Sequence, residues 1–317
     1  MTDSPTVAVI VPAFNRAALL PRAIASIWAT GYPALEVLIV DDGSNDDTGA
    51  VANTLAVSAP PGRCRVLRHP DGANHGVSAT RNLGIRATRS EWIAFLDADD
   101  AYLPNRFECL RNTQPQIDGY FGTARIVVEG EDDTGRAWLA QGSDLFGIRE
   151  RVTGRALLDQ LLAGRCWAIS AITVRRSLLD RTGLFDPEKH IAEDCDLWMR
   201  LGCVGRLEPV HLDDPISLYY RDGANSYHYD VAHRAANLRV LLDTRRWART
   251  VGLPATQRGL IAAAARNYAR RTLVAAFEAR RPEVGREVFR MMLAARQYRF
   301  FLDPQVWRVQ RAMGRIC

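Results

Sequence analysis

Several features that would place a chain in other protein classes are missing from these 317 residues. No apolar run approaches the roughly 18–20 residues that cross a bilayer, and the N-terminus lacks the basic and then apolar pattern of a secretory signal. The six cysteines are scattered and form no Cys-x-x-Cys pair, so we expect reduced thiols and no zinc site. These absences favour a cytoplasmic protein, either soluble or peripheral at the inner face of the cytoplasmic membrane.

Common nucleotide and calcium signatures are missing as well. Neither a GxGxxG nor a GxxxxGK[ST] pattern follows the first apolar run, which excludes a dinucleotide fingerprint and a P-loop there. The acidic stretch at residues 41–46 fails the spacing of an EF-hand loop. A nucleotide site in this chain must therefore be built from other residues.

Charge is distributed unevenly along the chain. From Asn225 to the end there are eighteen arginines, no lysine and six acidic residues, a formal charge of +12. Because the whole chain carries +5, the preceding residues must carry −7. Solvated helix faces would explain these arginines. The alternative is a peripheral contact between the basic C-terminal region and an anionic membrane surface; we expect no nucleic acid partner.

The first part of the chain alternates apolar runs with helical patterns. Four segments have the length and composition of buried strands: residues 7–11, 36–40, 65–68 and 91–96. Apolar side chains recur with helical spacing at residues 16–28 and 76–88. This alternation predicts an α/β fold with a mostly parallel, Rossmann-like sheet flanked by helices. With 47% apolar and 24% charged residues, the chain can bury an ordinary globular core.

Polar residues follow three of the predicted strands, at Pro12–Asn15, Asp41–Ser44 and Asp97–Asp100. Ligands of such folds bind at the carboxyl ends of parallel strands, so these residues predict a site. The clustered carboxylates at 97–100 repel each other unless a cation joins them, and Mg²⁺ and Mn²⁺ prefer oxygen ligands. An acidic turn or a helix N-cap would explain the same residues without a ligand.

The chain resembles family 2 glycosyltransferases of the GT-A fold over about residues 6–226. Seven segments occur in the family's order and at its spacing: VAVIVPAFNR, EVLIVDDGSNDDT, GVSATRNLGI, WIAFLDADD, VRRSLLDRTGLFD, AEDCDLWMRL and YYRDGANS. The resemblance implies a catalytic domain over residues 1–226, divided into a nucleotide-binding half at 1–101 and an acceptor-side half at 102–226. A basic helical C-terminal region would follow at 227–317.

The resemblance also implies which residues hold the donor. The implied nucleotide-sugar-binding residues are Pro12, Phe14, Asn15, Asp42, Arg81, Asp97 and Arg221. Among them Asp42 would accept a hydrogen bond from a pyrimidine, and Arg81 would face the diphosphate. Turn formation or helix capping is the structural alternative for Asp42, and a solvated helix face is the alternative for Arg81.

Asp97-Ala98-Asp99 resembles the family's DxD motif. The resemblance implies that Asp99 binds Mn²⁺ or Mg²⁺ directly, with Asp97 contacting the metal through water or the ribose. Such an ion would hold both phosphates and neutralise charge on the departing nucleoside diphosphate. Many relatives have His where this chain has Asp222, which puts a histidine contact at that position in doubt; His228 is an alternative.

Glu193-Asp194 resembles the family's acceptor-side acidic pair. A buried pair of like charges raises the pKa of one member, which suits a general base near neutral pH. We expect Asp194 to be the base and Glu193 to support it, and backside attack would invert the anomeric configuration. Charge complementing a helix dipole is the structural alternative.

These features predict an inverting, divalent-metal-dependent transferase of the hexosyltransferase type, acting in bacterial polysaccharide biosynthesis. The donor would be a nucleotide-sugar, for which we expect UDP, and the acceptor a hydroxyl of a glycan or lipid-linked molecule. One alternative is an inactive relative that binds nucleotide-sugar or an acidic polymer. The other is a sugar nucleotidyltransferase, although its glycine-rich loop with a basic residue is missing after the first strand.

Overall fold

The computed structural model describes residues 4–140, 142–222 and 231–313, and the chain forms two compact units. Unit 1 comprises residues 1–161 and 165–225, and unit 2 comprises residues 162–164 and 226–317. The predicted site residues belong to unit 1, whereas the strongly basic region belongs to unit 2.

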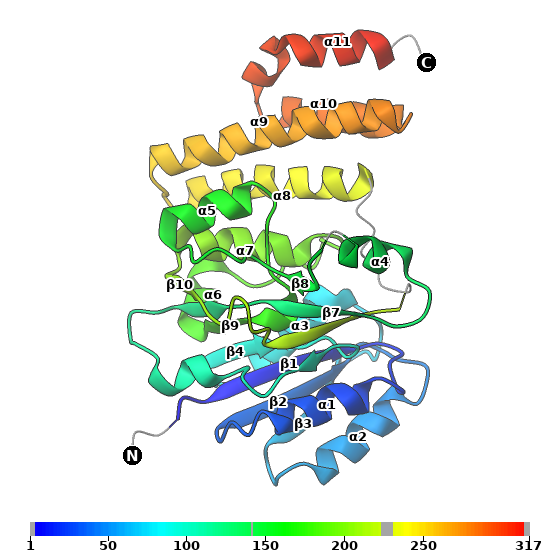
Figure 1. Cartoon of the computed structure of the whole chain (residues 1–317), viewed down its shortest axis with the longest axis vertical. Coiled ribbons are helices and arrows are strands. Elements are labelled where there is room, and N and C mark those ends of the chain that lie inside the picture. Colours follow the sequence, from blue (N-terminus) through cyan, green and yellow to red (C-terminus); the bar gives the residue numbers. More distant parts are fainter. Residues whose placement is uncertain (1–3, 141, 223–230, 314–317) are drawn as a thin grey trace. The chain divides into compact units, whose positions relative to one another are not determined.

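Unit 1 is organised around a seven-stranded sheet with the order β10–β6–β9–β4–β1–β2–β3 (Figure 1). Its strands are β1 Val7–Ala13, β2 Leu35–Asp41, β3 Cys64–Arg68, β4 Trp92–Phe95, β6 Gly119–Phe121, β9 Ile172–Arg175 and β10 Leu207–Pro209. Strand β9 runs antiparallel to β4 and β6, and the other pairings are parallel. The predicted α/β class with a mostly parallel sheet is confirmed, and the carboxyl ends of β1, β2 and β4 share one edge.

Helices cover both faces of this sheet. The α-helices of unit 1 are α1 Leu20–Ala29, α2 Thr48–Ser58, α3 Gly76–Ala87, α4 Asp133–Leu139, α5 Gly154–Leu162, α6 Arg176–Thr182 and α7 Glu193–Val204, of which α4 packs against β7 (Ala124–Val128), a strand outside this sheet. Val9 and Val11 belong to the apolar cluster that includes Leu20 of α1. Ile10 points to the opposite face and meets α3 at Gly84, where an added Cβ would lie 2.6 Å from Ile10 Cγ2. The alternating side chains of β1 thus bind helices on both sides.

A second sheet of four strands completes unit 1, in the order β5–β11–β7–β8. These strands are β5 Ala101–Tyr102, β7 Ala124–Val128, β8 Leu145–Phe146 and β11 Ser217–Arg221. Strand β11 pairs in parallel with β7 and antiparallel with β5. Because β5 follows directly after Asp97–Asp100, this pairing brings the end of the acceptor-side half next to the predicted metal ligands.

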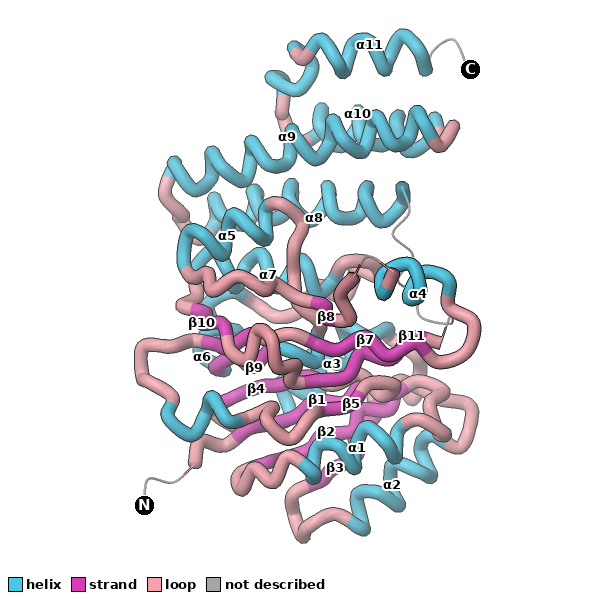
Figure 2. Tube along the Cα trace, viewed as in Figure 1, coloured by secondary structure: helices cyan, strands magenta, loops and turns pink. Residues whose placement is uncertain are grey.

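Unit 2 contains only helices over its described residues (Figure 2). They are α8 Val231–Thr250, α9 Ala255–Glu278, α10 Pro282–Ala294, the 3₁₀ helix η3 Tyr298–Leu302 and α11 Pro304–Met313. Helix α9 packs against α8, α10 and α11, and its many alanines allow close approach. The expected helical C-terminal region is present. No helix in the described ranges has the length and hydropathy of a membrane span.

Candidate active site

The loops after β1 and β2 are joined to each other at the carboxyl edge of the sheet. Asn15 adopts a left-handed conformation with φ of +52°, and its N–H donates to Ser44 Oγ at 3.0 Å. Its side-chain oxygen accepts a bond from the Asn45 N–H at 3.0 Å. Pro12 lies buried in β1, and Phe14 is exposed next to Asn15. Phe14 and Asn15 therefore stand where a nucleotide is expected.

Asp42 connects the end of β2 to the start of α3. Its Oδ1 accepts the His75 N–H at 2.8 Å and its Oδ2 accepts the Gly76 N–H at 2.9 Å. His69 Nε2 lies 3.6 Å from Oδ1. The carboxylate thus has the capping role that was the structural alternative. Because an ionised carboxylate has about four acceptor sites, it retains capacity for a base N–H.

Three carboxylates follow β4. Asp99 Oδ2 lies 3.6 Å from Arg16 Nε, and Asp100 Oδ1 accepts the Tyr220 N–H at 3.0 Å. Burial, and then the charge of Asp97, raise the pKa of Asp99 above its usual range. Burial also holds the pKa of Asp100 well above its ordinary value, and Asp100 Oδ2 is a buried oxygen with no hydrogen-bond partner. This concentration of carboxylates is what a divalent cation would stabilise.

Arg81 lies between Asp97, predicted on the donor side, and Glu193, predicted on the acceptor side. Its Nη2 is 2.8 Å from Asp97 Oδ1 and its Nη1 is 3.0 Å from Glu193 Oε1. The guanidinium is buried and also lies over the ring of Phe185, 5.3 Å from its centroid. Burial alone would lower the pKa of Arg81, but Asp97 and Glu193 outweigh it and raise the pKa. Arg81 therefore occupies a buried bridge and not the solvated helix face considered as an alternative.

The acidic pair forms the first turn of α7. Ala192, directly before it, adopts a left-handed φ of +60°, which is unusual for a residue with a Cβ. Asp194 Oδ1 accepts the Cys195 N–H at 2.6 Å. Burial, and then the charge of Glu193, raise the pKa of Asp194 to about 6. Since Glu193 is paired with Arg81, the two acids have different environments within one turn.

The loop before α7 is anchored at both ends. Ser78 of α3 donates its hydroxyl to the Lys189 carbonyl oxygen at 3.3 Å. The Lys189 ammonium lies 2.6 Å from Asp186 and 3.5 Å from Asp196 of α7. His190 Nδ1 comes within 3.9 Å of the position of a Cβ on Gly76. This loop, which follows β9 and α6, therefore contacts the nucleotide-binding half.

Arg221 is fully buried at the end of β11. Its Nε lies 2.6 Å from Asp132 Oδ2, and its Nη1 donates to Tyr219 Oη at 3.4 Å. A phosphate contact by Arg221 stays a prediction. Asp222, the next residue, is exposed, and its charge contributes to the raised pKa of Asp99. His228 lies outside the described residues.

Two arginines beside Asp99 were not identified from the sequence. Arg16 approaches its carboxylate, and Arg22 Nη2 donates to the Asp99 carbonyl oxygen at 2.9 Å. Arg22 also pairs with Glu129 at 2.8 Å and stacks over the Tyr220 ring, 3.5 Å from its centroid. The sequence feature that could have identified Arg16 is its position in the PAFNR segment, where it directly follows Asn15 at the end of β1.

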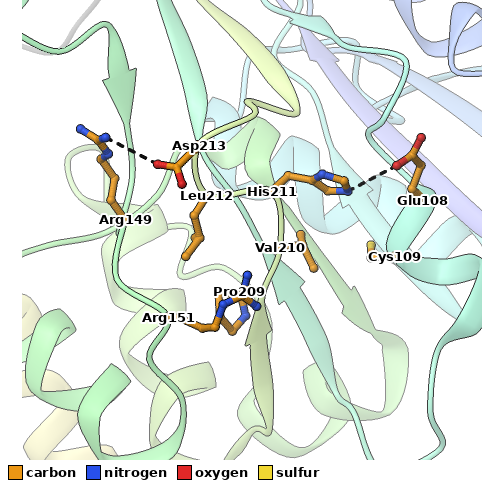
Figure 3. Close-up of a pocket in the computed structure, with 9 residues that line it drawn as sticks. All are labelled: Glu108, Cys109, Arg149, Arg151, Pro209, Val210, His211, Leu212 and Asp213. Carbon is orange, nitrogen blue, oxygen red and sulfur yellow. Dashed lines mark ion pairs between the residues drawn. The ribbon is translucent and has the colours of Figure 1, made fainter.

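A separate groove of about 750 Å³ contains none of the predicted site residues (Figure 3). Two ion pairs lie in it, one between Arg149 and Asp213 and one between His211 and Glu108, each at 3.6 Å. Its lining comes from η1 (Glu108–Asn112), the segment after β8 and the segment after β10. The groove offers no cluster of carboxylates comparable with Asp97–Asp100.

Comparisons with known proteins agree with this geometry. The family model described as glycosyl transferase family 2 matches residues 8–178, which is more than half of the chain. The chain belongs to glycosyl transferase family 2. The match includes β1, β2, β4 and the three strand ends described above, so the predicted family is confirmed.

Curated relatives of this family 2 chain have glycosyltransferase names. An uncharacterized glycosyltransferase from Rickettsia prowazekii is 27% identical over 220 residues, covering 69% of the chain and 64% of the relative. One from Nostoc is 28% identical over 235 residues, covering 70% of the chain and 66% of the relative. The matched part of the chain thus spans slightly less than two thirds of these relatives' lengths. Both relatives are named as glycosyltransferases.

Solved structures support the same fold. A structure of S. aureus TarS, residues 1–349, has a TM-score of 0.57 at 16% identity and covers 92% of this chain and 89% of that one. A mannosyltransferase from Pyrobaculum calidifontis, in complex with GDP-Man and Mn²⁺, has a TM-score of 0.56 at 17% identity, covering 99% and 86%. These are GT-A glycosyltransferases, and the predicted GT-A fold is confirmed.

Proposed function

We propose that this family 2 chain is an inverting, divalent-metal-dependent glycosyltransferase that moves a sugar from a nucleotide-sugar to an acceptor hydroxyl. We favour a UDP-sugar as donor and a glycan or lipid-linked molecule as acceptor. The observation that carries the proposal is the buried Arg81 bridge, which joins Asp97 of the donor side to Glu193 of the acceptor side. A transferase needs donor and acceptor groups within reach of one reacting carbon.

The structural comparisons support a nucleotide-sugar donor. One TarS structure is in complex with UDP-GlcNAc, and the Pyrobaculum mannosyltransferase holds GDP-Man with Mn²⁺. In this chain Phe14, Asn15 and Asp42, at the ends of β1 and β2, would contact the nucleoside. The acidic Asp42, which accepts hydrogen bonds only, suits the N–H of a pyrimidine such as uracil.

The residues after β4 fit a divalent cation. Asp99 is held with a raised pKa among like charges, and Asp100 has a buried oxygen without a partner. No ready-made group of three ligands occurs among the described residues, so an ion would take its remaining ligands from phosphates and water, as Mg²⁺ commonly does. Asp99 and Asp97 would hold Mn²⁺ or Mg²⁺, which would act as a Lewis acid toward the leaving diphosphate. Asp222 is a further candidate ligand, because its charge, like that of Asp97, raises the pKa of Asp99.

Asp194 would serve as the general base. With a pKa of about 6, its carboxylate is charged at neutral pH and basic enough to accept a proton. The acceptor hydroxyl would give its proton to Asp194 while its oxygen attacks the anomeric carbon. The bond from that carbon to the phosphate oxygen then breaks, and its electron pair leaves with the nucleoside diphosphate. Attack opposite the leaving group inverts the anomeric configuration.

The first test is calorimetric titration of UDP, GDP and dTDP into the whole chain, with and without Mn²⁺. The same titration is repeated with Asp99→Ala and with Asp144→Ala, a control that removes an exposed carboxylate paired with Arg125. We expect UDP binding that needs Mn²⁺, is retained by Asp144→Ala and is lost in Asp99→Ala. Binding that is indifferent to both the metal and Asp99 would contradict the proposed role of this segment. Sustained donor turnover then separates a transferase from an inactive binding protein.

A further inference from the structure

Four large apolar side chains are exposed within a short stretch of unit 2. Leu293, Tyr298, Leu302 and Trp307 expose 58%, 60%, 77% and 52% of their surface, respectively. The five other exposed large apolar side chains in the described ranges are scattered along the remaining chain. Leu302 and Trp307 line one groove, so these two lie on the same surface, and apolar side chains gathered in this way, unlike single ones, mark an interaction surface.

Unpaired arginines accompany these side chains. Residues 290–313 contain five arginines and one carboxylate, Asp303, a net formal charge of +4. Four of the arginines are exposed and have no ion pair or side-chain hydrogen bond with any residue that the structure describes: Arg296, Arg299, Arg308 and Arg311. By contrast, Arg239 of α8 is paired with Glu287 of α10 at 2.7 Å. The 293–311 surface therefore combines exposed apolar groups with cations available to an external anion.

A groove of about 340 Å³ lies within this surface, lined by Leu302, Pro304, Trp307, Arg308 and Arg311. The Trp307 indole N–H donates to the Phe301 carbonyl oxygen at 2.6 Å, which fixes the ring while half of the side chain stays exposed. A tryptophan with one satisfied polar edge and an exposed apolar body suits the membrane–water interface. The two guanidinium groups beside it suit lipid phosphates.

We propose that the 293–311 surface binds an anionic lipid bilayer, with Leu302 and Trp307 entering the interface and Arg308 and Arg311 contacting lipid phosphates. An acidic polymer would match the arginines but would leave Leu302 in water. A two-fold contact with a second copy would bring two positively charged patches together, because such an interface pairs one patch with itself. The proposal rests on unit 2 alone and does not depend on glycosyl transfer.

The test measures binding of the whole chain to vesicles of phosphatidylcholine with about 30 mol % phosphatidylglycerol, and to vesicles of phosphatidylcholine alone. Each arginine near an anionic surface contributes about 1 kcal/mol, or about fivefold in binding, so Arg308→Ser/Arg311→Ser should weaken binding by about 25-fold. Leu302→Ser/Trp307→Ser should weaken it by at least about tenfold, because apolar insertion is lost. Tryptophan emission of the wild type should shift to shorter wavelength with anionic vesicles, and Trp307→Phe should abolish the shift.

Matched control variants test whether vesicle binding depends on the 293–311 surface or only on the total charge and hydrophobicity of the chain. Arg246→Ser/Arg249→Ser removes the same charge from exposed positions of α8, and Val57→Ser/Val251→Ser removes two exposed apolar side chains elsewhere. Both should bind vesicles within about threefold of the wild type. Absence of binding to anionic vesicles, or equal losses in the controls, would overturn the proposal. So would sedimentation equilibrium without lipid, if it showed a wild-type dimer that Leu302→Ser/Trp307→Ser dissociates.

Discussion

Replacing Asp194 with Asn should abolish glycosyl transfer and at the same time stabilise the fold. The pKa of Asp194 is raised from its ordinary value of 3.8 to about 6, so the charged form is less favourable in the folded chain than in the unfolded one. A difference of about two pKa units corresponds to about 3 kcal/mol. The charge at the start of α7 also gains about 0.3–1 kcal/mol from the helix dipole, which Asn would lose. We therefore expect Asp194→Asn to raise the free energy of unfolding by about 1–3 kcal/mol at about pH 8.

The direction of this stability change follows from the protonation of Asp194 as pH changes. Because the folded-state pKa lies above the unfolded one, the unfolded chain releases the proton first as pH rises. Stability therefore declines between about pH 4 and about pH 6 and stays lower above that range. The gain from Asp194→Asn should be present at about pH 8, should shrink to about 0.5 kcal/mol at about pH 4 and should vanish below about pH 3, where the Asp194 carboxyl is neutral in both the folded and the unfolded chain. Asn can still accept the Cys195 N–H, so the local geometry is kept.

Two acids in the same helical turn serve as controls, because replacing either one should lower the stability of the fold and not raise it. Asp196 is buried and its Oδ2 lies 2.7 Å from Arg200 Nη2, so Asp196→Asn should lower stability by about 3–5 kcal/mol. Glu193→Gln should lower it by about 1–3 kcal/mol, because Arg81 loses a charged partner. Urea denaturation followed by circular dichroism measures all three variants, and donor consumption measures transfer. If Asp194→Asn is less stable than the wild type at about pH 8, or keeps more than about 1% of its activity, the assignment of the base is wrong.

Three further predictions concern the same site. Since Asp194 must be charged, kcat/KM should fall about tenfold per pH unit below about 6 and level off above it; a flat profile through this range would contradict the role of Asp194. Arg81→Gln should lower the free energy of unfolding by about 3–5 kcal/mol in urea titrations. Arg81→Lys should lower it by less, because an ammonium keeps the charge but cannot span Asp97 and Glu193 as the guanidinium fork does. Asp222→Asn should raise the Mn²⁺ concentration that half-saturates nucleotide binding by about tenfold, whereas an unchanged value would exclude this carboxylate from the metal site.

The first half of unit 1 was predictable because its signals are local. Apolar runs at residues 7–11, 36–40 and 91–96 became central strands, and the carboxyl-end rule placed Asp97–Asp100 at the edge where ligands bind. Periodicity and strand-end chemistry act over short stretches of chain, so a single sequence contains them.

The second half of unit 1 depends on contacts between residues that lie far apart in the sequence, and such contacts cannot be read from local sequence patterns. Arg81 and Glu193 are separated by 112 positions, and Arg221 and Asp132 by 89. Glu193 follows β9, which enters the sheet antiparallel between β4 and β6, whereas Arg221 meets Asp132 through the parallel pairing of β11 with β7. The resemblance supplied Arg81 and Arg221 as donor contacts, but their buried carboxylate partners follow from this topology. Whether either arginine also touches a phosphate stays a prediction.

Lys189 is the only lysine of the chain. Apart from the terminal amine, it is therefore the only target for reagents that acylate amines. Acylation would remove the charge that pairs with Asp186 and Asp196, and would attach its label to the loop directly before the acidic pair. Immobilising the protein through Lys189 would tether it at the loop directly before Glu193 and Asp194. A small fluorophore coupled at this residue would lie in that loop, and its emission during a titration with nucleotide-sugar would test whether the loop responds to the proposed donor.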